Sequence, residues 1–155
     1  MTRLILVFIF LQLNWLGLSA QTAEKDSVEI EVKQLIDQGG SLIKRRQLDS
    51  AVVLLKYTLD YTERELGEDH LLAGVIAHTL GYVHMVQEQQ DEAKSYYLEA
   101  LRIKQINLSP PNDPLAVTLN GLGLIYEYEE NYTLAESNYI EARTNWEGAY
   151  GKDHT

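Results

Sequence analysis

The segment LGYVHMVQEQQDEAKSYYLEA, residues 80–100, returns as LGLIYEYEENYTLAESNYIEA at residues 122–142. When residues 67–108 are aligned with residues 109–150, the two copies share nine identities, and most of their other apolar positions stay apolar. The same interval also leads backwards, because it separates Gly39 and Ala51 from a glycine and an alanine of the first segment. A repeat of this length indicates one supersecondary unit that stacks on its neighbours, because it cannot bury its apolar face alone.

Each repeat has the pattern of two helices joined by a short polar turn. In residues 67–108, apolar residues recur at helical spacing on both sides of the polar stretch 87–90, and residues 109–150 show the same arrangement. The repeated signature is Leu80, Gly81, Ala93, Tyr97 and Ala100, then Leu122, Gly123, Ala135, Tyr139 and Ala142, with Gly39 in phase before them. The sequence therefore predicts an all-α fold of stacked antiparallel hairpins at residues 28–66, 67–108 and 109–150.

Three glycines, Gly39, Gly81 and Gly123, occupy the same phase of successive predicted helices. A glycine in a helix interior costs roughly 0.5–1 kcal/mol relative to alanine, so a compensating contact is needed. We predict that each glycine lets the second helix of its hairpin approach closely, with a small residue such as Ala93 on the facing side.

The signature resembles a known family. The run Leu80-Gly81-x-x-His84, followed by Ala93-x-x-x-Tyr97, is similar to the tetratricopeptide pattern L-G-x-x-Y and A-x-x-x-F. The ordinary tetratricopeptide repeat has about 34 residues, whereas the repeat in this sequence has about 42. This length, together with LGEDH at 66–70 and TLNGL at 118–122, resembles the long repeats of kinesin light chain and its bacterial relatives. The resemblance covers residues 28–155 and implies a right-handed α-solenoid.

Residues 1–20 do not belong to the repeats. They combine a basic Arg3, an apolar run from Leu4 to Leu11 and a small-residue junction at Ser19-Ala20, which is typical of a secretory signal peptide. We predict cleavage after Ala20, a linker at 21–27, and an exported mature chain, periplasmic or extracellular, that contacts no membrane. The alternative is a membrane anchor formed by residues 4–18, although a span needs about 20 predominantly apolar residues.

Residues 151–155, Gly-Lys-Asp-His-Thr, resemble the start of a further repeat, because Gly67-Glu68-Asp69-His70 stands at the same phase two repeats earlier. A solenoid needs a terminal cap with a polar outer face, and no such cap is visible in the sequence. We therefore expect a truncated fourth repeat and a longer parent protein.

Charge and motifs narrow the functional classes. The formal net charge is −10 at pH 7, which disfavours nucleic acid and anionic membrane surfaces as partners. Metalloprotease, nucleophile-elbow, P-loop and paired-cysteine motifs are all missing from the sequence. We therefore expect no enzymatic activity, no cofactor and no metal. The oligomeric state is left open.

The resemblance places the first helix of each hairpin on the concave surface of the stack. It implies a peptide-binding groove lined by His78, Tyr82, Met85, Asn120, Leu124, Glu127 and Tyr128, beside Val75 and Val117. Asn120 matches the groove asparagine of the family, whose amide both donates to and accepts from a peptide backbone. Tyrosines beside it suit peptide recognition, because they provide contact area at low entropic cost.

Two functions fit this sequence. The first is an exported, non-catalytic interaction module that holds a peptide or protein segment in its groove. The second is a sensory or regulatory arm of a larger bacterial enzyme or signalling protein, in which a protease-like or histidine-kinase domain would follow Thr155. The reading frame downstream of Thr155 distinguishes the two.

Overall fold

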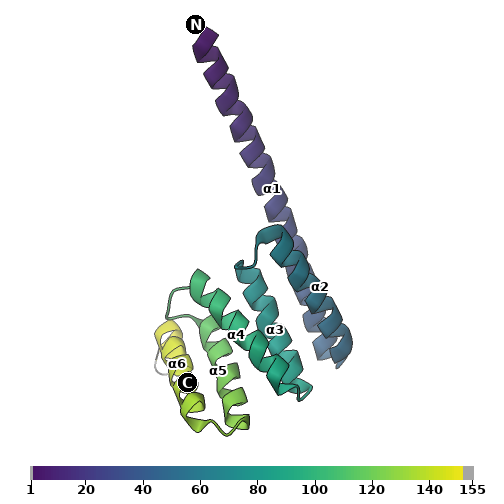
Figure 1. The fold of residues 1–155 in the computed structure, drawn as a ribbon, viewed down its shortest axis with the longest axis vertical. Helices are drawn as coiled ribbons and strands as arrows, with labels where there is room; N and C mark the ends of the chain where they lie inside the picture. Colours follow the sequence, from purple (N-terminus) through teal and green to yellow (C-terminus); the bar gives the residue numbers. More distant parts are fainter. Residues whose placement is uncertain (1, 152–155) are drawn as a thin grey trace.

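The computed structural model describes the backbone of residues 2–151 and the side chains of residues 21–151, and this part of the chain is helical throughout apart from short connections. The helices are α1 (Thr2–Lys44), α2 (Leu48–Leu66), α3 (Leu71–Val86), α4 (Gln90–Asn107), α5 (Asp113–Tyr128) and α6 (Tyr132–Tyr150). They form three consecutive hairpins that stack side by side (Figure 1). The predicted all-α architecture of stacked hairpins is confirmed.

The hairpins form two rows of helices. In the inner row, α3 contacts both α1 and α5, whereas α2, α4 and α6 make no close backbone contacts with one another among the described residues. Helices of one row that touch while those of the other row stay apart make a stack curve toward the touching row. We call α1, α3 and α5 the inner helices and α2, α4 and α6 the outer helices.

The hairpin turns repeat with the helices. Arg46, Glu88 and Glu130, which hold the same position in successive repeats, all adopt left-handed backbone conformations with φ of 61°, 62° and 58°. In each turn the next residue donates its backbone N–H to a carbonyl of the preceding helix, as in Gln89 to His84 at 2.9 Å. These bonds satisfy carbonyls that a helix end leaves free and offset the cost of the left-handed residue.

The recurrent glycines do admit a close helix contact, with a different partner from the one predicted. A Cβ added at Gly39 or Gly81 would come within 2.8 Å of a side chain on the second helix of the same hairpin, and one at Gly123 would also collide. The atoms met belong to Leu55, Tyr97 and Tyr139, respectively. These residues lie one turn after the predicted alanines, which are buried but are not the groups that the glycines admit.

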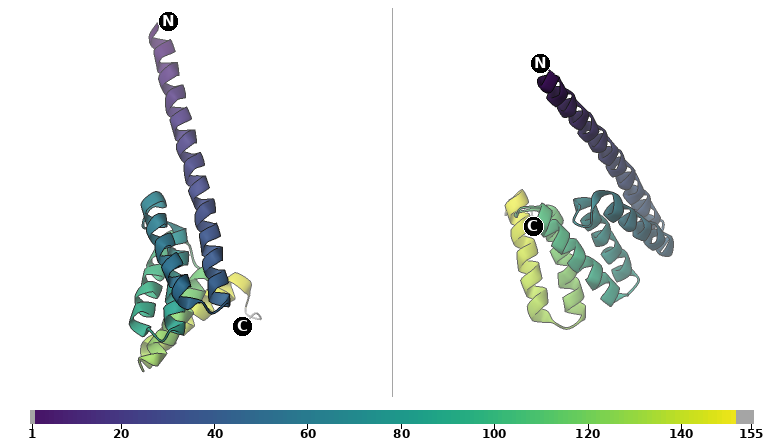
Figure 2. Two further views of the ribbon diagram at one scale, coloured as in Figure 1. Left: turned by 90° about the vertical axis from the view of Figure 1, so that its right-hand side faces the viewer. Right: turned by 45° about the horizontal axis from the view of Figure 1, so that its top comes forward.

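Helix α1 is longer than the first repeat requires and projects beyond the stack (Figures 1 and 2). Residues 21–27, which the sequence predicted as a linker, continue α1 with exposed side chains. The predicted signal peptide and the anchor at 4–18 lie outside the residues whose side chains are described, as do residues 152–155 of the repeat start predicted at 151–155. Within the described part of the chain, no helix has the length and apolar character needed to cross a membrane.

The outward side of α1 differs from the equivalent sides of α3 and α5. In α3 the positions that pack against the preceding hairpin are the buried Ile76, Leu80 and Val83. The equivalent residues one repeat earlier are Gln34, Gln38 and Ser41, all exposed. Polar residues at these positions give the outward side of α1 a polar, solvent-exposed surface where α3 has an apolar contact.

Candidate peptide-binding face

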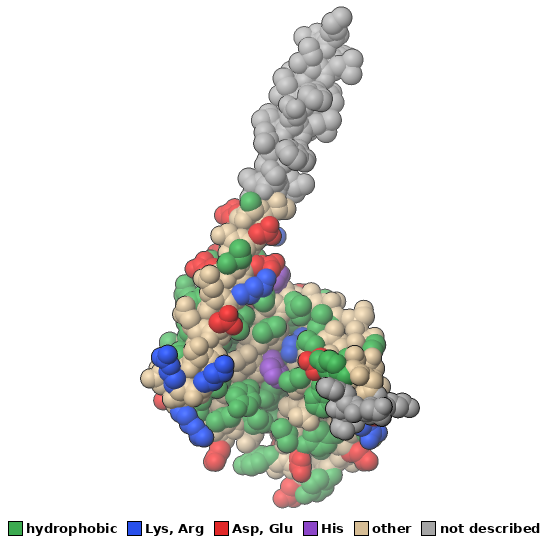
Figure 3. Space-filling view, turned by 180° about the vertical axis from the view of Figure 1, so that it is seen from behind, with side chains coloured by type: hydrophobic (Ala, Val, Ile, Leu, Met, Phe, Trp, Pro, Cys, Tyr) green, Lys and Arg blue, Asp and Glu red, His purple; other side chains and the backbone are tan. Residues whose placement is uncertain are grey.

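The inner sides of α3 and α5 carry an exposed apolar stripe. On α3, Val75 is half-buried and Tyr82 and Val86 are exposed, at spacings of seven and four residues that place them on one side of the helix. Val117, Leu124 and Tyr128 hold the same positions on α5, with 37%, 42% and 67% of their surface exposed. We call these six residues the inner stripe. Figure 3 shows the molecule from this side, with hydrophobic side chains gathered over its middle.

The inner stripe is almost free of charge. Helix α3 contains no Asp, Glu, Lys or Arg, and α5 contains only Asp113 and Glu127. The outer helices carry many charged residues, among them Lys94 on α4, which forms an ion pair of 2.8 Å with Glu129 at the end of α5. An apolar stripe of this kind on a strongly acidic chain marks a surface suited to binding rather than a merely solvated helix face.

Of the predicted groove residues, Tyr82, Leu124 and Tyr128 belong to the inner stripe and are open to solvent. Asn120 lies on the same side of α5, between Val117 and Leu124, and is half-buried. These four residues therefore share one side of the inner helices, and their role in a groove stays a prediction.

The structure turns two other predicted residues away from the open surface. Nδ1 of His78 lies 3.2 Å from the Thr118 hydroxyl, so this side chain occupies the seam between α3 and α5. Met85 is partly buried and packs against the core cluster that contains Tyr97 and Ile125. Both residues form the bottom of the face rather than its walls.

Glu127 is exposed, but its carboxylate is engaged. Its Oε2 accepts a hydrogen bond of 2.7 Å from the hydroxyl of Tyr139 on α6. The bond raises the pKa of Tyr139 to about 12, together with burial, which is the larger cause. Glu127 therefore ties an inner helix to its outer partner.

A buried lysine beneath this face was not predicted from the sequence. Lys104 is 3% exposed and donates from Nζ to the Thr118 hydroxyl at 2.8 Å and to the Pro114 carbonyl at 3.1 Å. No described carboxylate lies within ion-pairing distance of it. The repeat alignment offers one signal for it. Lys104 is the only charged residue at its repeat position, where the other two repeats have Thr62 and Trp146.

Burial sets the protonation of this seam. It lowers the pKa of Lys104 to about 8, an effect that Asp113 partly opposes. Burial also lowers the pKa of His78 to about 4, and the positive charge of Lys104 acts in the same direction. At neutral pH the seam therefore holds a neutral imidazole beside a largely protonated amine.

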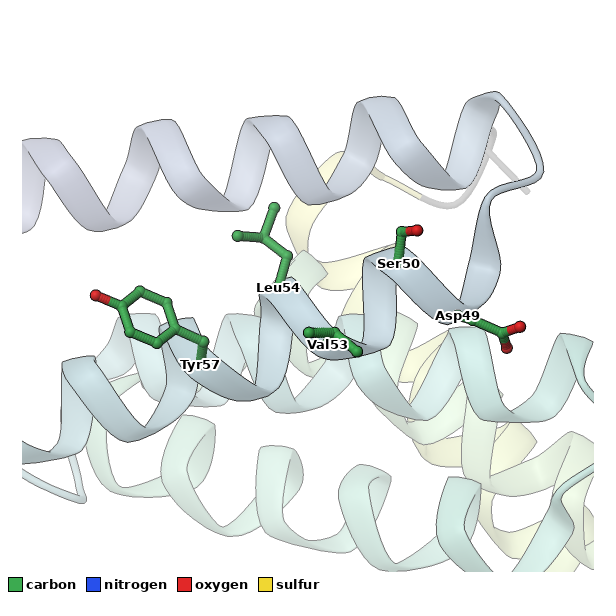
Figure 4. Close-up of a pocket in the computed structure, with 5 residues that line it drawn as sticks. All are labelled: Asp49, Ser50, Val53, Leu54 and Tyr57. Atoms are coloured by element: carbon green, nitrogen blue, oxygen red, sulfur yellow. The ribbon is translucent and has the colours of Figure 1, made fainter.

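A second depression lies on the outer helix α2 and is lined by Asp49, Ser50, Val53, Leu54 and Tyr57 (Figure 4). Leu54 points toward α1, whereas Val53 and Tyr57 are 71% and 59% exposed. The depression contains no cluster of titratable groups. Among the described residues as a whole, no three His, Asp or Glu side chains converge in a way that could hold a metal ion.

Comparisons with known proteins agree with this architecture. A family profile described as a tetratricopeptide repeat matches residues 75–114. An uncharacterized protein, ycf37 of Guillardia theta, is 29% identical over 146 residues, which cover 88% of this chain and 74% of the relative. The crystal structure of BtubC (BKLC) from P. vanneervenii superposes with a TM-score of 0.70 at 21% identity, covering 77% of this chain and 48% of that one.

Residues 75–114 of the chain therefore form a tetratricopeptide repeat, in agreement with the resemblance seen in the sequence, and the stacked-hairpin fold is that of the BtubC chain. The chain spans about half the length of the BtubC chain. The descriptions of the matched family and of the ycf37 relative mention no catalytic activity.

Proposed function

We propose that this protein is a non-catalytic interaction module that binds a segment of another protein across the inner stripe of α3 and α5. Tetratricopeptide repeats are in general protein-interaction modules. The observation that carries the proposal is the inner stripe itself, which stays exposed and nearly uncharged in a chain of net charge −10. Apolar and aromatic side chains supply the contact area of such a site, while Asn120 offers both a donor and an acceptor to a peptide backbone.

The proposal predicts different effects for two leucines of equal exposure. Leu124 in the inner stripe is 42% exposed, and Leu98 on the outer helix α4 is 44% exposed. A peptide selected from a library against the protein should lose roughly tenfold in affinity for Leu124→Ala, as expected when an anchor contact of about 1–2 kcal/mol is removed. Leu98→Ala should bind the same peptide as the wild type does. Titration of both variants by calorimetry measures the difference.

Because the two leucines have the same exposure, a general effect on folding would lower both affinities together. An unchanged affinity for Leu124→Ala, or an equal loss for Leu98→Ala, would remove the inner stripe as the binding surface. In that case the depression around Val53 and Tyr57 on α2 would be the next surface to test.

We also propose that residues 1–20 direct export and are removed. Support comes from the charged start, the short apolar run and the Ser19-Ala20 junction. Intact-mass measurement of the protein secreted from a bacterial host should give a chain that begins at Gln21. Retention of residues 1–20 in a membrane fraction would favour the anchor at 4–18 instead.

A further inference from the structure

The side chain of Tyr97, on the outer helix α4, extends to the inner helices α3 and α5. Its ring, only 2% exposed, lies between two glycines, because a Cβ at Gly81 on α3 or at Gly121 on α5 would come within 2.8 Å of it. The ring base faces Gly81, and Cζ, which carries the hydroxyl, is the atom closest to Gly121. The side chain therefore passes between α3 and α5. Burial and the neighbouring Tyr82 of the inner stripe raise the pKa of Tyr97 to about 12, so the phenol stays protonated at neutral pH.

The Tyr97 hydroxyl has no hydrogen-bond partner among the described residues, although buried tyrosine hydroxyls normally have one. The hydroxyl oxygen is accessible to solvent. The fully buried polar atoms without a partner in the described part of the chain do not include it. The hydroxyl oxygen therefore contributes to the small exposed area of this side chain.

The neighbouring repeats show how this position is normally satisfied. In the third repeat the equivalent Tyr139 donates to Glu127 at 2.7 Å. The residue one repeat before Glu127 is Met85, which offers no carboxylate. In the first repeat the equivalent pair is Leu55 and Ile43, which have no polar group to satisfy. Only the second of the described repeats combines a tyrosine with an apolar residue at the partner position.

A second open polar atom lies beside the first. The rings of His78 and Tyr97 have centroids 5.3 Å apart. Lys104 donates to the Thr118 hydroxyl, which itself donates to the Pro114 carbonyl at 3.1 Å. The Thr118 hydroxyl has a single proton, and when that proton goes to the Pro114 carbonyl, the 3.2 Å contact with His78 is made by the Nδ1–H of His78 as donor.

The tautomer with a proton on Nδ1 leaves Nε2 of His78 with a free lone pair. Nε2 has no partner in the described part of the chain, yet it is not enclosed, in contrast to Nε2 of the buried His84. The Tyr97 hydroxyl, which can donate, and the acceptor Nε2 of this His78 tautomer thus belong to two neighbouring rings at the bottom of the face.

We propose that the Tyr97 hydroxyl and Nε2 of His78 form a subsite that binds an uncharged amide group of the segment held on the inner stripe. The proposal rests on the proposed function and names the chemistry of its ligand. An amide fits because it presents a carbonyl to the donor and an N–H to the acceptor. A cation would be repelled by Lys104 beneath, and a carboxylate would meet the lone pair of Nε2. The amide comes either from an Asn or Gln side chain or from the peptide backbone.

The substitution Tyr97→Phe tests the subsite, because it removes only the hydroxyl. This group has no hydrogen-bond partner among the described residues. We expect the urea midpoint of unfolding to stay at the wild-type value. A selected peptide whose binding depends on Leu124 should lose roughly tenfold in affinity, as for one hydrogen bond of about 1.4 kcal/mol. Tyr139→Phe is the matched control. It loses the bond to Glu127 and should bind the peptide as the wild type does.

Variants of the peptide separate the two sources of the amide. If a side chain supplies it, replacing that Asn or Gln by Leu should abolish the difference between wild type and Tyr97→Phe. If the backbone supplies it, no side-chain replacement should do so, whereas N-methylation of one peptide bond should. Equal affinity of wild type and Tyr97→Phe would overturn the subsite while the inner stripe remains the binding surface. If no selected peptide loses affinity when Leu124 is replaced by alanine, the proposed function itself is contradicted.

Discussion

Gly81→Ala is expected to lower the free energy of unfolding by about 1–3 kcal/mol, the usual range for overpacking a filled core. The new Cβ would lie 2.8 Å from Cδ1 of Tyr97, closer than such atoms approach. Tyr97 cannot move aside easily, because Gly121 confines the ring on its other side at the same distance. The loss should therefore exceed the gain of about 0.5–1 kcal/mol that alanine brings to a helix interior.

Gly40 provides the matched control, because it is also an interior helical glycine and an added Cβ would meet nothing within 4 Å. Gly40→Ala should raise the free energy of unfolding by about 0.5–1 kcal/mol through helix propensity alone. Urea titrations of both variants measure the two effects. Stabilisation of the protein by Gly81→Ala would contradict the close contact between α3 and the Tyr97 ring.

Lys104→Met is expected to stabilise the protein by about 1–2 kcal/mol at neutral pH. Holding the protonated amine in the seam costs free energy on the order of 3 kcal/mol, given a pKa of about 8 in the folded chain. Methionine has a similar shape and carries no charge. It loses two hydrogen bonds, but the Pro114 carbonyl keeps the bond from Thr118 at 3.1 Å, so no acceptor is left without a partner.

The pH dependence separates this effect from simple repacking. An unfolded lysine titrates near a pKa of about 10.4, so between about pH 8 and pH 10 the unfolded chain binds more protons than the folded one. The contribution of Lys104 therefore makes the wild type more stable as the pH rises through this window. The stabilising effect of Lys104→Met should accordingly be larger at pH 7 than at pH 10, in paired urea titrations. A difference that is independent of pH would show that Lys104 is not held with a lowered pKa.

Much of the candidate site could be predicted from the sequence, because the repeat assigns a phase to each residue. Tyr82, Leu124 and Tyr128 hold phases that differ from those of the buried glycines, and these residues are exposed on the inner face. His78 has the same phase as Asn120, yet it is turned into the seam. Phase cannot predict this difference, because it depends on the Thr118 and Lys104 side chains that the neighbouring elements bring against it.

The sequence by itself determined the repeat and its length, the hairpins and the positions of the close contacts, because helical periodicity and the cost of interior glycines act locally along the chain. Tertiary structure alone decided what those contacts enclose. It places the ring of Tyr97 between two inner helices, and it buries Lys104 with no carboxylate of the described residues in ion-pairing distance. The satisfaction of a polar group depends on atoms from several helices at once, and a pattern read along one chain does not contain those distances.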